Sequence, residues 1–209
     1  MATMVKRWPG RTDPHVVWDH YDDYAGELAF DVGANIGQVA KLIAPRFERV
    51  VSFEPCAESY AILAAEAPAN VTALPWAVSD TDGPITLYEA HESIQTGQLV
   101  SGEGLYWGPI EGERRVEAFT LDSLAAIHGT PDFIKVDTEG HELQVLSGAR
   151  ATLASRPTLL IEVHHAEAGK AILAILGDIG GYDVSTICHE GRPESLAVEN
   201  HWWIKARAT

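Results

Sequence analysis

Two short apolar runs in the second half of the chain end in side chains that can exchange protons. Asp137 follows the run FIKV, and Glu139 comes two residues later. Glu162 and His164 have the same spacing in the run LLIEVH. Residues two apart in a strand point to the same side, so each pair can act together. Asp137 and His164 are the candidates for a general base, and Glu139 is a candidate for orienting a substrate.

The same residues can also have structural roles or bind a metal ion. Glu139 and Glu142 stand near the start of a run with helical spacing, where a carboxylate is favoured by the helix dipole. Lys135, inside the strand, is expected to pair with Glu162 and to be structural. Carboxylates and an imidazole can also hold Mg²⁺ or another divalent ion, but no dense ligand motif is present, and we predict no metal.

A glycine-rich turn near the start of the chain predicts a nucleoside site. The stretch FDVGANIG begins as a strand, turns at Gly33 and Gly37, and continues as a helix. Glycines let the backbone approach a ligand closely, and Glu54, at the end of the next strand, is placed to accept hydrogen bonds from ribose hydroxyls. We therefore expect a cofactor that contains a nucleoside.

Charge favours S-adenosylmethionine as that cofactor. A dinucleotide loop needs a third glycine and holds a pyrophosphate, whereas Asp31 stands directly before this turn and would repel phosphate. S-adenosylmethionine has no phosphate, and its ammonium and sulfonium groups are attracted to a carboxylate. An NAD-dependent oxidoreductase and a non-catalytic nucleoside-binding domain remain the alternatives.

The elements that must position these residues alternate along the chain. Ile36, Val39, Ala40, Ile43 and Phe47 have the spacing of one helix face, and the pattern returns at 171–179. Strands that alternate with helices predict an α/β fold, a mostly parallel sheet with helices on both faces. Such sheets bind ligands at the carboxyl ends of their strands. The expected strands are 27–31, 49–54, 71–78, 133–137, 158–164, 182–187 and 201–206.

One region interrupts this alternation. Segments 83–90 and 115–119 read as an extra, hairpin-like strand pair around a Gly-rich loop, 91–114, without periodicity. A loop of this length in a compact domain is usually functional, and we expect a substrate lid. Tyr106 and Trp107 in this loop are the candidate substrate-binding aromatics.

Composition limits the class of protein and its partners. With 209 residues, 46% of them apolar, the chain is expected to form one domain over 1–209, with a polar lead at 1–24. Thirty acidic against fifteen basic residues give a formal charge of -15, which repels nucleic acid and anionic membranes. No signal peptide or membrane-spanning run is visible. We expect a cytoplasmic protein that acts on a small molecule.

Five segments together resemble one known family. FDVGANIG, VVSFEP, AVSDTDGPITLY, DFIKVDTEGHELQVLSGA and LLIEVH occur in the order and spacing of the FkbM family of S-adenosylmethionine-dependent methyltransferases. The resemblance covers about 30–165. It implies a Rossmann-like class I methyltransferase fold, with a seven-stranded sheet whose last strand is antiparallel. It also implies methyl transfer to a hydroxyl of a sugar or natural product.

The resemblance further assigns the cofactor contacts, position by position. Glu54 would hold the ribose. The methionine part would contact Asp31, Gly33, Ala34, Asn35 and Gly37. The adenine would lie near Pro55, Ala77, Val78 and Ser79.

Overall fold

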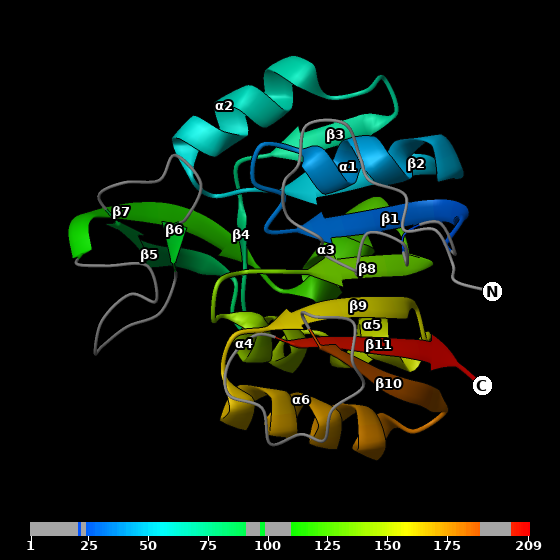
Figure 1. Ribbon diagram of the computed structural model, residues 1–209. Coiled ribbons are helices and arrows are strands. Elements are labelled where there is room, and N and C mark those ends of the chain that lie inside the picture. Colours follow the sequence, from blue (N-terminus) through cyan, green and yellow to red (C-terminus); the bar gives the residue numbers. More distant parts are fainter. Residues whose placement is uncertain (1–20, 22–23, 91–96, 99–109, 189–201) are drawn as a thin grey trace.

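The central sheet is mostly parallel and has seven strands with the last one antiparallel, as the family resemblance implies. The structure, a computed structural model, describes residues 21, 24–90, 97–98, 110–188 and 202–209. Its larger sheet has seven strands in the order β10-β11-β9-β8-β1-β2-β3 (Figure 1). Only β11 runs antiparallel to both of its neighbours within this sheet. The strands are β1 (Gly26–Val32), β2 (Phe47–Phe53), β3 (Val71–Leu74), β8 (Phe133–Val136), β9 (Thr158–Val163), β10 (Tyr182–Cys188) and β11 (Trp202–Ala208).

Helices cover both faces of this sheet. In the described residues they are α1 (Gln38–Ile43), α2 (Ala57–Glu66), α3 (Leu121–His128), α4 (Glu142–Ser147), α5 (Arg150–Ala154) and α6 (Ala166–Ile179). Phe30 of β1 packs in the larger core, on the face covered by α3, α4, α5 and α6. Its neighbour Ala29 points to the opposite face, where it packs with Ile43 of α1. Apolar residues on both faces of β1 therefore fix the sheet between two helical layers.

The helical face predicted from Ile36 to Phe47 is too long at both ends, because α1 begins only at Gln38. The helix α1 ends at Ile43, a 3-10 turn (Ala44–Arg46) follows, and Phe47 begins β2. Pro45 lies in that turn, and a proline cannot supply the N–H that a continuing helix needs. Phe47 is still buried, in the core between α1 and the sheet.

A second sheet of four strands stands beside the carboxyl ends of the central strands (Figure 1). Its order is β4-β7-β5-β6, and the antiparallel pair of β5 and β7 confirms the predicted extra strands. The expected strand 71–78 is wrong as a single element, because β3 pairs with β2 whereas β4 pairs with β7. Pro75, between the two, has no N–H for a ladder. The strands are β4 (Ala77–Val78), β5 (Gly83–Ala90), β6 (Gly97–Gln98) and β7 (Ile110–Phe119).

The expected loop at 91–114 is shorter than predicted, because β7 begins at Ile110. Tyr106 and Trp107 lie outside the described residues, so the lid and its two aromatic residues stay predictions. Among the helices that the structure describes, none is long and apolar enough to cross a membrane.

Candidate active site

The glycine-rich turn after β1 packs directly on the backbone that follows β8. Gly33, Asn35 and Gly37 all have positive φ, at 70°, 51° and 83°. A Cβ added at Gly33 would lie 1.8 Å from the carbonyl oxygen of Asp137, so no other residue fits at this position. Lys135 Nζ donates to the Gly33 carbonyl oxygen at 2.6 Å. These contacts join the turn to β8.

A cavity opens beside this turn, at the carboxyl ends of β1, β2 and β8 and next to β4. It is open to solvent, and its volume is about 50 Å³. The predicted site residues in its wall are Gly33, Asn35, Glu54, Pro55, Ala77, Val78, Asp137 and Glu139. The remaining wall residues are Val32, Phe53, Trp76 and Thr138.

Glu54 is held in this wall by backbone amides. Its Oε2 accepts a hydrogen bond from the Asn35 N–H at 2.7 Å, and its Oε1 accepts one from the Cys56 N–H at 2.8 Å. Burial raises the pKa of Glu54 to about 7, against the lowering effect of these two amides. Each carboxylate oxygen keeps a second lone pair, which can accept a hydroxyl of a bound ligand.

Lys135 lies between two carboxylates that were not predicted as its partners. Asp31 is its register partner on the adjacent strand. Its Nζ lies 3.4 Å from Asp31 Oδ1 and 3.4 Å from Asp137 Oδ2, and the predicted partner, Glu162, also attracts it electrostatically. Burial lowers the pKa of Lys135, but Asp137 and Asp31 together raise it above its ordinary value. Lys135 is therefore a fixed cation between the two carboxylates.

His164 lies between two carboxylates. Its Nδ1 is 3.0 Å from Glu142 Oε1, and its Nε2 is 3.1 Å from Glu139 Oε2. Burial lowers the pKa of His164, but the two carboxylates outweigh it and raise the pKa to about 11. With a proton on each nitrogen, His164 cannot accept another. A doubly protonated His164 does not fit the predicted role as a base, and Asp137 stays a candidate for that role.

Glu142 shapes the turn that carries Asp137 into the cavity wall. Besides His164, its Oε1 accepts hydrogen bonds from Thr138 N at 3.1 Å, Thr138 Oγ1 at 3.2 Å and Gly140 N at 2.8 Å. Glu139, inside this turn, has a φ of 56°, which is uncommon for a residue with a side chain. The fully buried Glu142 therefore holds this turn by accepting its hydrogen bonds, and it is not only a charge at the first turn of α4.

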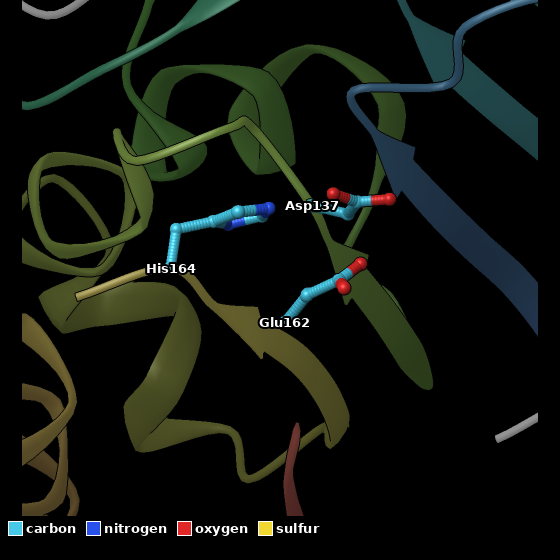
Figure 2. A group of neighbouring side chains, drawn as sticks. All are labelled: Asp137, Glu162 and His164. Atoms are coloured by element: carbon cyan, nitrogen blue, oxygen red, sulfur yellow. The ribbon is translucent and has the colours of Figure 1, made fainter. Parts of the chain in front are cut away.

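Asp137, Glu162 and His164 point toward one another from the ends of β8 and β9 (Figure 2). Burial and the nearby Asp137 carboxylate raise the pKa of Glu162 to about 9. Burial also acts to raise the pKa of Asp137, but Lys135 and His164 outweigh it and lower the pKa. Glu162 consequently carries a proton at neutral pH, and Asp137 is an ionised carboxylate at the cavity wall.

A family model, the methyltransferase FkbM domain, matches residues 31–184, which is most of the chain. The chain belongs to the FkbM methyltransferase family. The hexuronic acid methyltransferase AglP of Haloferax volcanii is 29% identical to it over 156 residues. That match covers 73% of this chain and 62% of AglP, so the chain spans less than two thirds of its relative.

Solved structures support the same fold for this FkbM domain. The methyltransferase FkbM of Methylobacillus flagellatus KT has a TM-score of 0.55 at 20% identity, over 86% of this chain and 43% of that one. A putative methyltransferase of Streptococcus mutans, in complex with SAH, has a TM-score of 0.52 at 12% identity, over 99% of this chain and 100% of that one. Both share the Rossmann-like methyltransferase architecture.

Several predicted site residues of the FkbM domain are not among the residues that line the cavity. They are Asp31, Ala34, Gly37, Ser79 and His164.

Two residues of the site were missed by the sequence analysis. Trp76 lines the cavity, and an aromatic residue after Pro75 at a strand end is a usable signal for it. Glu142 was assigned to the helix dipole, although Gly140, two residues earlier, marks a turn that needs hydrogen-bond partners.

Proposed function

We propose that this FkbM domain transfers the methyl group of S-adenosylmethionine to an oxygen atom of a sugar-like acceptor. The observation that carries the proposal is the cavity itself, which has Glu54 at the end of β2 and Asp137 after β8 in one wall. Glu54 is placed for the ribose hydroxyls. Asp137 is an ionised carboxylate that can take the proton of an acceptor hydroxyl.

The charge of the wall favours this cofactor over a dinucleotide. Three carboxylates, Glu54, Asp137 and Glu139, line the cavity, and the lining residues in the described part of the chain include no lysine or arginine. A pyrophosphate would meet only like charge there, whereas a sulfonium is attracted. The SAH bound by the Streptococcus mutans neighbour supports the same choice.

The relative AglP suggests the chemical class of the methyl acceptor. AglP is by name a hexuronic acid methyltransferase, and its similarity to this chain extends over 156 residues. A sugar acid offers several oxygen atoms and no competing nitrogen, so it fits an enzyme that mainly aligns an oxygen with the methyl carbon and the sulfur. We infer a uronic acid or a related sugar as the acceptor, and a protein that acts in the cytoplasm without nucleic acid or membrane partners.

Cofactor affinity should depend on pH through Glu54. Its pKa of about 7 in the folded protein lies above the ordinary value for a glutamate, so folding favours the protonated form. That contribution to stability is full at low pH and is lost as the pH rises through about 7. The ionised form is the better acceptor for ribose hydroxyls, so adenosylhomocysteine should bind roughly tenfold more weakly at pH 6 than at pH 8. Calorimetric titration across this range measures the change.

Glu54→Gln is the matched control for this titration. It keeps the shape of the side chain but cannot ionise, so its affinity should be weaker than that of the wild type and independent of pH. An affinity equal to that of the wild type at pH 8, where Glu54 is ionised, would remove Glu54 from the cofactor site.

The transfer itself is tested with methyl-labelled S-adenosylmethionine and two acceptors, a glycan ending in a uronic acid and the same glycan ending in a neutral hexose. We expect one methyl group on an oxygen atom of the sugar, and more of it on the uronic acid glycan. The Glu54→Ala protein should transfer none at the same cofactor concentration. Binding of NAD without adenosylhomocysteine, or a label found on nitrogen, would overturn the proposal.

A further inference from the structure

We propose that Asp137, Glu162 and His164 form a binding site for a divalent metal ion such as Mg²⁺ or Mn²⁺. Each residue offers one ligand atom, and these three atoms all lie within 4.8 Å of one another. Asp137 comes from the end of β8, and the other two come from β9 and the residue after it, so two adjacent strands hold the group (Figure 2). Carboxylate oxygens suit Mg²⁺, and a mixed oxygen and imidazole set suits Mn²⁺.

The orientation of His164 is that of a metal ligand. Its Nδ1 lies 3.0 Å from Glu142 Oε1, and Glu142 is itself fixed by the backbone amides of Thr138 and Gly140. Histidines that bind metal commonly donate their second N–H to a carboxylate in this way, which sets the tautomer and the direction of the ring. Nε2 therefore faces the other acids, and the ion would replace the proton between Nε2 and Glu139.

Glu139 is the natural fourth ligand. Its Oε2 lies 3.1 Å from His164 Nε2 and its side chain is 22% exposed, so it has room to turn from the imidazole to an ion. The same residue lines the cavity together with Asp137. An ion bound here would therefore stand at the edge of the cavity, where its remaining positions are open to a ligand.

In methyl transfer the ion would bind two neighbouring oxygens of the acceptor, as in a vicinal diol or a hydroxy acid. This role rests on the function proposed above, whereas binding of the ion does not. Held by Asp137, Glu162 and His164, the ion would lower the pKa of the acceptor hydroxyl. The O–H bond would then break and its proton would pass to water, the O–CH₃ bond would form, and the S–CH₃ bond would break to leave adenosylhomocysteine. Asp137 would act in this case as a ligand of the ion.

Binding is tested by titrating Mn²⁺ into protein that has been stripped with a chelator and then freed of it, with free Mn²⁺ followed by electron paramagnetic resonance. We expect one ion per chain. Glu162→Gln and His164→Gln should each weaken binding at least tenfold. Glu117→Gln, an exposed acid on β7, is the control and should bind as the wild type does. Circular dichroism shows whether each variant is folded.

Absence of bound Mn²⁺ at millimolar concentration, or equal binding by the folded Glu162→Gln and His164→Gln variants, would overturn the site and would mean that protons alone balance these carboxylates. Adenosylhomocysteine binding is measured on the same metal-free sample. Loss of Mn²⁺ binding with normal adenosylhomocysteine binding is a failure of the metal proposal only, and the converse is a failure of the proposed function only. A full transfer rate in chelator would overturn the role of the ion in transfer.

Discussion

Replacing Asp137 by asparagine is expected to slow methyl transfer by about 10² to 10⁴-fold while adenosylhomocysteine binds almost normally. The Asp137 carboxylate lies in the cavity wall, ionised beside Lys135 at 3.4 Å. Asparagine keeps its size but can neither take a proton from the acceptor nor bind a cation as strongly. Single-turnover rates at saturating cofactor, together with calorimetric titration of adenosylhomocysteine, separate transfer from cofactor binding.

Asp132→Asn is the matched control for Asp137, because Asp132 precedes the same strand at its opposite end. Its Oδ2 accepts hydrogen bonds from the backbone of β1, from Glu27 N at 2.7 Å and Leu28 N at 3.0 Å. Neither donor belongs to the cavity wall. Its replacement should lower stability by about 1 kcal/mol and leave the transfer rate unchanged. A full rate in a folded Asp137→Asn protein would exclude Asp137 from the reaction.

Replacing Glu142 by alanine is expected to lower the free energy of unfolding by about 3 to 5 kcal/mol. Glu142 is 0% exposed, and its Oε1 accepts hydrogen bonds from two residues of the turn in addition to His164. Alanine leaves these half-buried donors without an acceptor and leaves the His164 charge without one of its two carboxylates. Urea denaturation followed by circular dichroism measures the loss.

Glu142→Gln separates the shape of this side chain from its charge. Glutamine keeps one oxygen for Thr138 and Gly140 but loses the negative charge beside His164, so its loss of stability should be clearly smaller than that of alanine. An alanine variant within about 1 kcal/mol of the wild type would show that water replaces the carboxylate and that the turn does not depend on it.

The sequence predicted the central sheet because its signals are local. Each strand is a short apolar run, and Ala29 and Phe30 on β1 show how neighbouring residues face opposite helical layers. The break at Pro75 was missed, because the pairing of β4 with β7 depends on a strand more than thirty residues away along the chain. Local patterns do not report such long-range partners.

The same holds for the site: features set by the local sequence were predicted, and contacts between strands were not. The rule that ligands bind at the carboxyl ends of parallel strands placed Glu54 and Asp137 in one wall. The partners of Lys135 and His164 were not predicted, because they depend on the register of β1 with β8 and on the turn at Gly140. Spacing along one strand indicates which side chains share a face, but it does not say which of them meet across strands.

The contact between Gly33 and the Asp137 carbonyl oxygen means that the glycine-rich turn and the segment after β8 cannot shift independently. Lys135 strengthens this connection, because its ammonium group donates to the Gly33 carbonyl and pairs with the Asp137 carboxylate. Under the proposed function, the cofactor would bind at the first segment and the acceptor at the second. Their binding free energies would then be linked, and thermodynamic reciprocity would require each to tighten the other by the same factor.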